Sequence, residues 1–151
     1  MEIRKLTEAE KPAALELAWR VFQIFEAPEY APEGVETFRA YVQDPSTAKH
    51  LTVYGALEGE TMVGVLALRT GERHISLFFV DAAWHRRGVG RALFQALLGD
   101  TGGAPLTVNS SPYAVEVYRH LGFVPTGEEQ IVDGLRFTPM QFSVQTEECT
   151  K

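Results

Sequence analysis

The sequence predicts a single α/β (α+β) domain over residues 1–151, built on a mixed sheet of about seven strands. Stretches with the two-residue hydrophobic period of strands interleave with stretches that have the 3.6-residue period of amphipathic helices, and two late helices each follow directly on a strand. The expected element order is β-α-α-β-β-β-α-β-α-β-β. Because ligands bind such sheets where strand ends meet helix starts, we expect a site near Val80 and Asn109.

The first half of the chain alternates between helical and strand patterns. Thr7 and Glu10 have the spacing of a capping box, which predicts a helix start, and the prolines after Ala27 break that helix. A second apolar stripe stops at Asp44-Pro45, since a residue before proline disfavours the helical conformation. The predicted elements are a strand at 1–6, a helix at about 9–25, a shorter helix through Val35, Phe38 and Val42, and strands at 51–57, 62–68 and 75–80.

The second half predicts two strand-helix units and a closing hairpin. Ser111 and Pro112 supply an N-cap residue and a first-position proline, and Gly122 is a stop signal for the helix between them. The pair Asp133-Gly134 is the strongest local hairpin signal in the chain. The predicted elements are a helix from Val89 to before Gly99, a strand at 106–109, a helix between Pro112 and Gly122, and hairpin strands at 131–132 and 135–144.

Charge and composition argue against several classes of protein. A net charge of -6 disfavours binding to nucleic acid or to acidic membranes, which both need a basic face. The single cysteine, Cys149, allows neither an intramolecular disulfide nor a cysteine-rich metal site, and the histidines lack metal-ligand spacing. The sequence has no signal-like start and no apolar run of about 18 residues. We expect a cytoplasmic protein with no metal, nucleic-acid or membrane partner.

The segment 85–91, His-Arg-Arg-Gly-Val-Gly-Arg, has the features of an anion site. Gly88 and Gly90 let the backbone approach a bulky anion, and the helix that they open presents unpaired N–H groups. A Rossmann fingerprint needs a third Gly or Ala where Leu93 stands, and a Walker A motif needs a following Gly-Lys-Ser/Thr, which the segment lacks. A phosphate cradle of backbone amides and a plain strand-to-helix turn remain as alternatives.

Two segments resemble the motifs of the GCN5-related N-acetyltransferase (GNAT) family. The run from Phe78 to Leu93 resembles its motif A, whose loop has the form Gln/Arg-x-x-Gly-x-Gly/Ala, and the run from Asn109 to Phe123 resembles its motif B. The sequence departs from motif A at His85, where the family has Gln or Arg. The resemblance implies a GNAT-like mixed sheet and acetyl-CoA as the acetyl-donor cosubstrate.

The resemblance also implies where acetyl-CoA binds. Its pantetheine arm is expected between diverging strands, bonded to main-chain groups of Phe78 and Val80. Its phosphates are expected at the glycine loop, where arginine side chains add charge-assisted hydrogen bonds. Asn109 either fixes the pantetheine amide or caps the turn that follows its strand. The residues expected to bind the cofactor are Phe78, Val80, Arg86, Arg87, Gly88, Val89, Gly90, Arg91 and Asn109.

Tyr118 is the candidate catalytic residue, because at the matching position of the family a tyrosine protonates or hydrogen-bonds the departing CoA thiolate. With ordinary pKa values near 10 for tyrosine and 8.5 for a thiol, full proton transfer is uphill by about 2 kcal/mol, so a hydrogen bond to the thiolate suffices. The residue that deprotonates the amine is left open, as is deprotonation through water. The candidate bases are Glu26, Glu29, Glu72, His74 and Asp81.

The function implied is transfer of the acetyl group to an amine acceptor by direct attack. The alternative is a CoA-binding or regulatory module that has lost turnover, which the departure at His85 favours. The acceptor is a small-molecule or peptide amine; polyamines, aminoglycosides and peptide N-termini all suit an acidic protein. The edge of the C-terminal hairpin is compatible with pairing in a homodimer.

Overall fold

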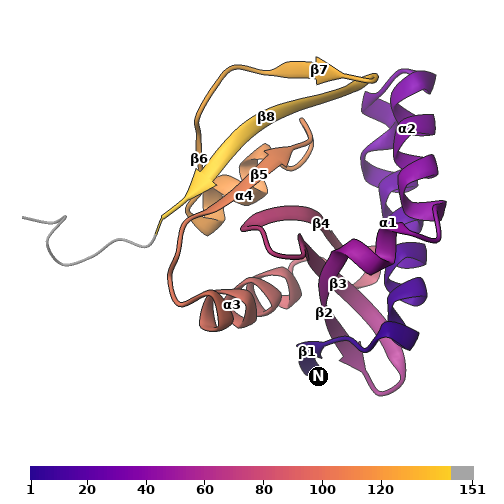
Figure 1. The fold of residues 1–151 in the computed structure, drawn as a ribbon, viewed down its shortest axis with the longest axis vertical. Helices are drawn as coiled ribbons and strands as arrows, with labels where there is room; N and C mark the ends of the chain where they lie inside the picture. The colour runs from indigo at the N-terminus through magenta and orange to yellow at the C-terminus, as the bar shows by residue number, and fades with distance from the viewer. Residues whose placement is uncertain (144–151) are drawn as a thin grey trace, which may run out of the picture.

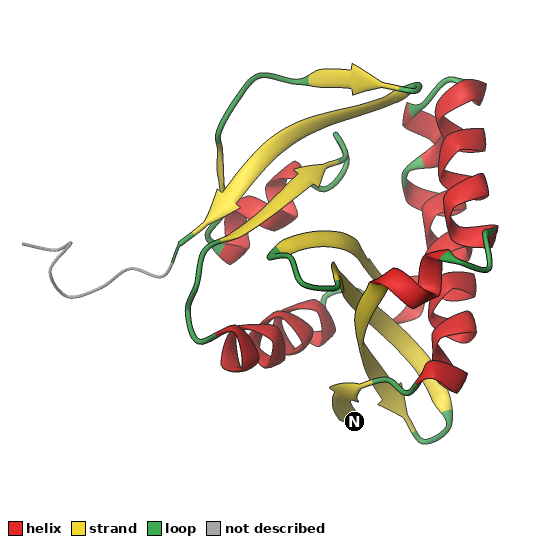
Figure 2. Cartoon of the chain, viewed as in Figure 1, coloured by secondary structure: helices red, strands yellow, loops and turns green. Residues whose placement is uncertain are grey.

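The computed structural model describes residues 1–143 and contains an eight-stranded sheet with helices on both faces (Figures 1 and 2). The strands run in the order β1-β2-β3-β4-β5-β8-β6, and β7 pairs with β8 beside this row. Every paired strand is antiparallel to its neighbour except β4 and β5. The predicted mixed α/β fold is confirmed, with one more strand than expected. Val144, predicted at the end of the last strand, and Cys149 lie outside the described residues.

The order of elements along the chain matches the prediction apart from one short strand. The strands are β1 (Glu2–Lys5), β2 (Leu51–Glu58), β3 (Thr61–Arg69), β4 (His74–Val80), β5 (Leu106–Ser110), β6 (Val124–Pro125), β7 (Gln130–Val132) and β8 (Leu135–Phe142). The helices are α1 (Lys11–Phe25), α2 (Pro32–Gln43), α3 (Val89–Thr101) and α4 (Val115–Leu121). Short 3-10 turns occupy Glu8–Glu10, Ala27–Glu29, Thr47–His50 and Ala82–Trp84.

Two hydrophobic cores lie on opposite faces of the sheet. On one face α1 and α2 pack against the sheet through a cluster that includes Phe22 and Phe79. On the other face α3 and α4 contribute Leu93, Phe94 and Tyr118 to a second cluster. Because the central strands β2, β3 and β4 are covered on both faces, their sequences are nearly continuous in apolar residues, as the sequence pattern indicated.

Two predicted details at helix starts have different outcomes. The capping box is present: the Thr7 N–H donates to the Glu10 carboxylate at 2.8 Å, ahead of a 3-10 turn that leads into α1. The prediction that α4 begins at Ser111-Pro112 is wrong, because the helix starts at Val115. The Ser111 hydroxyl instead accepts the N–H of Ala114 at 3.3 Å, so it stabilises the turn before the helix.

The missed strand, β6, has only two residues, Val124 and Pro125. A two-residue segment carries no alternation of apolar and polar side chains, and proline is rare within a sheet except at its edges. The strand forms at the edge of the sheet by pairing with β8, with Val124 opposite Gln141. The sequence signal was therefore absent, since the strand depends on a partner that arrives later in the chain.

Strands β4 and β5 are held together over a very short length. Their parallel pairing is limited to two partners, His74 with Thr107 and Ile75 with Val108. Beyond these residues β4 stays paired with β3 as far as Val80, while β5 stays paired with β8 as far as Ser110. The two strands therefore diverge toward their C-terminal ends, as the family resemblance implied.

The hairpin of β7 and β8 reaches across the top of the view in Figure 1 to α2. Asp133 and Gly134 form its two-residue turn, both with positive φ (52° and 81°), which confirms the predicted Asp-Gly hairpin. The Thr37 hydroxyl donates to the Asp133 carbonyl at 2.7 Å. The backbones of Gly34 and Gly134 approach so closely that a Cβ on Gly34 would overlap the Gly134 carbonyl oxygen. The hairpin tip is thus fixed to α2.

Gly34→Ala should lower the free energy of unfolding by about 1–3 kcal/mol, because the added methyl group forces the hairpin tip away from α2. Urea unfolding of both proteins measures the change. Gly99→Ala in α3 is the matched control: no atom lies within 4 Å of its added Cβ, so the gain in helix propensity should raise stability by up to about 1 kcal/mol. Equal effects at both positions would contradict the close packing of the hairpin on α2.

Candidate functional site

Two cavities meet where β4 and β5 diverge. The larger, of about 850 Å³, lies between the end of β4, the start of α3 and helix α4. The smaller, of about 370 Å³, lies between α1, α2 and the β7–β8 hairpin. Phe78, Phe79, Ala114 and Tyr118 line both cavities. A molecule in the larger cavity and a molecule in the smaller one would therefore meet beside these four residues.

The glycine loop forms one wall of the larger cavity. Gly88 is the N-cap of α3 with φ of 82°, a left-handed conformation that suits glycine, and the space around it is open. Gly90 lies in the first turn, where an added Cβ would rest in ordinary contact, 3.6 Å from the Phe78 ring. Gly88, Val89, Gly90 and Arg91 all line the cavity. The unpaired N–H groups of the first helical turn give this end a partial positive charge suited to anions.

Main-chain groups of β4 form the opposite wall. The Asp81 N–H donates to the Val63 carbonyl of β3 at 2.8 Å, and Phe79 is paired with Val65. Because main-chain groups alternate between the two sides of a strand, those of Phe78 and Val80 face away from β3, toward the gap beside β5. The structure thus brings the predicted Phe78 and Val80 main chain together with the glycine loop.

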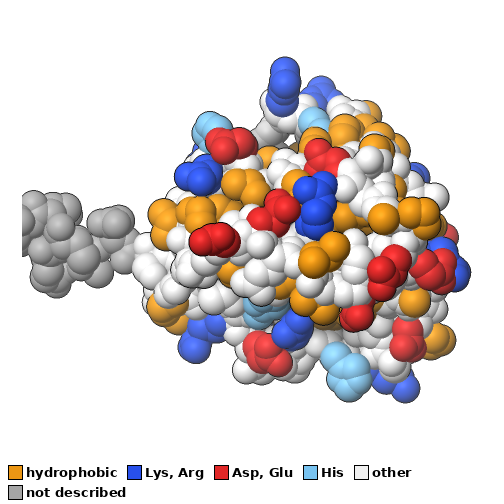
Figure 3. All heavy atoms as spheres, turned by 90° about the horizontal axis from the view of Figure 1, so that it is seen from above, with side chains coloured by type: hydrophobic (Ala, Val, Ile, Leu, Met, Phe, Trp, Pro, Cys, Tyr) orange, Lys and Arg blue, Asp and Glu red, His pale blue; other side chains and the backbone are white. Residues whose placement is uncertain are grey.

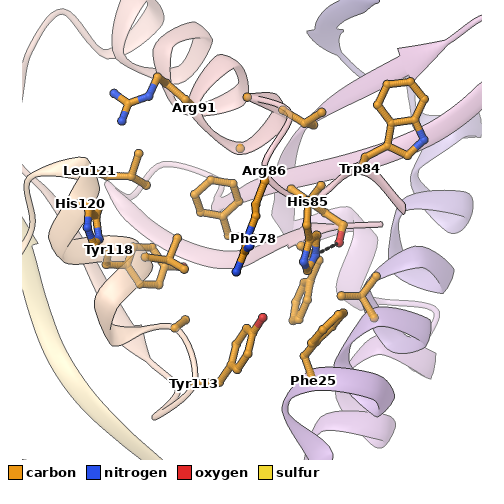
Figure 4. A pocket seen from close by; sticks show the side chains of 18 residues that line it. Phe25, Phe78, Trp84, His85, Arg86, Arg91, Tyr113, Tyr118, His120 and Leu121 are labelled. Carbon is orange, nitrogen blue, oxygen red and sulfur yellow. Dashed lines mark hydrogen bonds between the residues drawn. The ribbon is translucent and has the colours of Figure 1, made fainter. Parts of the chain in front are cut away.

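His85 is bonded within the protein. Its Nε2 donates a hydrogen bond to the Val80 carbonyl at 2.7 Å, since the carbonyl oxygen can only accept, and its ring packs 4.7 Å from the ring of Phe25. Figure 4 shows this bond at the edge of the larger cavity. The histidine that departs from the family pattern therefore ties the glycine loop to the end of β4 and to α1.

The three arginines of the loop are not equivalent. Arg86, which has a positive φ of 64°, extends into the larger cavity, and Arg91 lines it from the first turn of α3 (Figure 4). Arg87 instead lies over the ring of Trp84, 4.6 Å from its centroid, and does not line the cavity. The structure therefore brings Arg86 and Arg91 to the site and places Arg87 on its outer side.

Tyr118 is buried, with 6% of its surface exposed, between Phe78 and Phe123 at ring distances of 5.9 and 5.2 Å. No hydrogen bond joins its hydroxyl to another residue lining the larger cavity (Figure 4). Burial raises the pKa of Tyr118 above its usual value, and the charge of Glu26 raises it further. The phenol therefore keeps its proton at neutral pH and can donate a hydrogen bond into the cavity.

Asn109 lies on the smaller cavity and does not line the larger one. Its predicted contact with pantetheine stays a prediction. Two candidate bases also line the smaller cavity, Glu26 and His74. His74 is occupied by a 2.8 Å hydrogen bond between its Nδ1 and the Thr107 hydroxyl, and burial lowers its pKa.

The other candidate bases lie away from the meeting point of the cavities. Asp81 is paired with Arg20 at 3.0 Å and caps the 3-10 turn through the Ala83 N–H. Glu72 is paired with Arg69 at 3.5 Å. Glu29 is exposed and lines neither cavity. The geometry therefore favours Glu26 over the other four.

Glu26 follows the last residue of α1 and is partly buried at the side of the smaller cavity. Burial raises the pKa of Glu26 to about 7; the Ser111 hydroxyl opposes this shift and the neighbouring charge of Glu29 adds to it. A carboxyl group with a pKa near 7 is half ionised at neutral pH, which suits a group that must accept a proton there. Local sequence patterns could not rank it, because its burial beside Ser111 brings together segments that are far apart in the chain.

Acidic, basic and apolar side chains are interspersed on the face shown in Figure 3. Within residues 1–143, no three His, Cys, Asp or Glu side chains are grouped to hold a metal ion. None of the helices in that range combines the length and hydropathy that a membrane crossing requires.

Solved structures with the same fold are acetyltransferases. A GCN5-related N-acetyltransferase from Rhodopseudomonas palustris matches with a TM-score of 0.81 and 23% identity over 95% of each chain. The PaiA N-acetyltransferase from Thermoplasma acidophilum, in complex with coenzyme A, matches with a TM-score of 0.74 and 17% identity over 95% of this chain and 98% of that one. Tetrahymena GCN5 matches with a TM-score of 0.66 and 18% identity over 96% and 97%. No curated protein matches in sequence.

The family match covers most of the residues that line the two cavities. The model of the acetyltransferase (GNAT) domain matches residues 26–144, which include the glycine loop, Tyr118 and the β7–β8 hairpin. The match begins at Glu26, at the end of α1. The chain therefore belongs to the GNAT acetyltransferase family.

Proposed function

We propose that this protein transfers the acetyl group of acetyl-CoA to a primary amine by direct attack, with Tyr118 assisting the leaving thiolate and Glu26 accepting the amine proton. The observation that carries the proposal is the meeting of two cavities beside Tyr118. A module that only binds CoA needs a single cavity. A transferase needs two, joined at the reacting atoms.

The larger cavity has the features that acetyl-CoA requires. Its 850 Å³ suits a long ligand, and its glycine loop offers amide N–H groups to the pyrophosphate. Arg86 and Arg91 supply positive charge beside those amides. The main-chain groups of Phe78 and the N–H of Val80 face the gap, where the amides of a pantetheine arm can pair with them as a further strand would.

Two groups near the junction, the place where the two cavities meet, can perform the two steps of the reaction that involve a proton. The amine nitrogen attacks the thioester carbonyl carbon and the C–S bond breaks, so negative charge moves to sulfur. The Tyr118 hydroxyl donates a hydrogen bond to that sulfur. Because its pKa is raised above 10 while an ordinary thiol has a pKa near 8.5, complete proton transfer is more unfavourable than for an ordinary tyrosine. Hydrogen bonding to the thiolate is thus the role that fits Tyr118.

Glu26 completes the balance of protons. The attacking amine must lose one proton, and a carboxylate on the acceptor side of the junction can take it directly or through one water. The negative charge of Glu29 raises the pKa of Glu26, and Arg136 and Glu29 act with opposite signs on the pKa of the nearby Tyr30. Burial is the larger influence on its pKa.

Gly88→Ala should weaken the binding of CoA about tenfold, because a side chain at φ of 82° costs about 1–2 kcal/mol and shifts the first amides of α3. Isothermal titration with CoA measures the loss. Gly90→Ala is the matched control, since its Cβ has room beside Phe78 and should change affinity less than threefold. A tighter complex with Gly88→Ala would refute the role given to the loop.

Tyr118→Phe should lower kcat about 100-fold while leaving the KM for acetyl-CoA within twofold, because the ring keeps its packing and only the hydrogen bond to the thiolate is lost. Thiol release with an amine substrate measures both constants. Tyr113→Phe removes a hydroxyl from the same cavity, where Tyr113 is 41% exposed, and should be nearly silent. If the Tyr118 variant keeps wild-type kcat, this tyrosine has no part in the reaction.

The pH dependence should identify Glu26. A base must be deprotonated to act, so kcat/KM of the wild type should rise through a limb near pH 7, where the raised pKa lies. Glu26→Gln should lose this limb and about 100-fold in rate. Glu29→Gln should keep the rate and move the limb to lower pH, because it removes the neighbouring charge that raises the pKa. An unchanged limb in Glu26→Gln would assign it to another group.

A further inference from the structure

We propose that the acceptor is a monoamine with a flat apolar body, such as an arylalkylamine. This inference rests on the proposed function, because it concerns the occupant of the smaller cavity. Its basis is a cavity with aromatic walls in which several polar side chains are already hydrogen-bonded within the protein. Three independent features of that cavity, its walls, its hydrogen bonds and its charges, select the same class of amine.

Aromatic rings form much of the wall of the smaller cavity. Phe22 and Phe38 are stacked with their ring centroids 4.1 Å apart, and Phe22 is also stacked on Tyr30 at 5.8 Å. Flat rings of this kind favour flat apolar ligands, through the area that they bury and through ring-ring contacts. The aromatic residues of this wall include Phe22, Tyr30, Phe38, Tyr41, Phe78 and Phe137.

Four hydroxyl groups of this wall are occupied, those of Tyr30, Thr37, Tyr41 and Ser76. The Tyr41 hydroxyl and the Ser76 hydroxyl are hydrogen-bonded at 2.6 Å, and the Tyr30 hydroxyl donates to the Arg136 carbonyl at 3.2 Å. The Thr37 hydroxyl is bonded to the hairpin carbonyl described above. A polyhydroxylated acceptor would have to bury hydroxyl groups without partners or break these bonds, at a cost of about 1–3 kcal/mol per group. The cavity therefore disfavours sugars such as aminoglycosides.

The charges of the smaller cavity suit one ammonium group. Its acidic lining residues are Glu26 and Asp133, and they are matched by two arginines, Arg69 and Arg136. A polyamine carries a positive charge every few bonds and needs a carboxylate for each buried one. The carboxylate of Glu26 lies on the same cavity as Tyr118, so a single amine is directed to the junction and the rest of the acceptor meets apolar surface.

The hairpin limits the length of the acceptor. The β7–β8 hairpin lines the smaller cavity with Val132, Asp133, Leu135, Arg136 and Phe137. Its tip is fixed to α2 by the Thr37 hydrogen bond and the Gly34–Gly134 contact. With about 370 Å³, the cavity is at the small end of the range of ligand sites. An extended peptide would have to displace this hairpin, whereas a compact amine fits beneath it.

A panel of four amines tests the inference with the full-length enzyme and acetyl-CoA: phenethylamine, spermidine, kanamycin and triglycine. Phenethylamine should give a kcat/KM at least tenfold above that of the other three. A higher value for any of the others overturns the inference and leaves the proposed function intact. If acetyl-CoA raises the melting temperature but none of these amines, nor a wider amine screen, releases thiol, the proposed transfer fails and the inference fails with it.

A second carboxylate in the cavity should change this preference. Val132→Glu places one on the lining of the smaller cavity at a residue that is 54% exposed, so folding is preserved. It should raise kcat/KM for the diamine putrescine about threefold, relative to phenethylamine, as expected for a partly screened ion pair. The control is Ile131→Glu, 64% exposed on the same strand but outside the cavity lining, which should leave the ratio unchanged. Equal ratios in both variants would contradict the acceptor site assigned to this cavity.

Discussion

The rest of the structure depends on the short parallel contact between β4 and β5. Two residue pairs join these strands, and after them each strand follows a different partner. A sheet that stayed paired through Val80 and Ser110 would satisfy more main-chain groups, yet it would leave no gap in which a ligand could bind. The divergence leaves the main-chain groups of Phe78 and the N–H of Val80 available to a ligand, while the Val80 carbonyl accepts the hydrogen bond from His85.

Each strand that borders the gap is held by elements on its outer side, which explains how the divergence persists. The strands up to β4 are held by α1 and α2 on one face and by α3 on the other. Strand β5 is held by β8 along its whole length, from Leu106 to Ser110. The β7–β8 hairpin then spans the gap and fixes its tip to α2 through the Thr37 hydrogen bond. The hairpin thus bridges the gap away from the glycine loop. The gap stays open to ligands beside the loop.

Local patterns in the sequence predicted the helices, the hairpin turn and the glycine loop, because each depends on residues that are near one another in the chain. The left-handed φ values of Gly88 and Gly134 follow directly from such local signals. The start of α4 was predicted wrongly because Ser111 and Pro112 are good helix-start residues locally, whereas the chain there is fixed by β8 and by Ser111 itself.

The site depended on contacts that sequence patterns do not contain. Arg87 looked equivalent to Arg86, but Trp84 holds it outside the larger cavity. Glu26 was one of five candidate bases, and what distinguishes it is burial by segments more than 80 residues away, near Ser111. A site near Asn109, which lines the smaller cavity, was expected, but the extent of that cavity was not, because its wall combines α1, α2 and a hairpin that has no acetyltransferase motif of its own.

In the proposed reaction, burial at the junction also couples its two titratable groups, Glu26 and Tyr118. The negative charge of Glu26 is one of the two causes that raise the pKa of Tyr118. When Glu26 accepts the proton of the attacking amine, that charge is neutralised, and the pKa of Tyr118 must fall toward the value set by burial alone. The phenol therefore becomes a stronger hydrogen-bond donor just as negative charge develops on sulfur. One feature, burial where the two cavities meet, therefore has two effects. It raises the pKa of Glu26 to near neutral pH, and it lets the charge of Glu26 change the pKa of Tyr118.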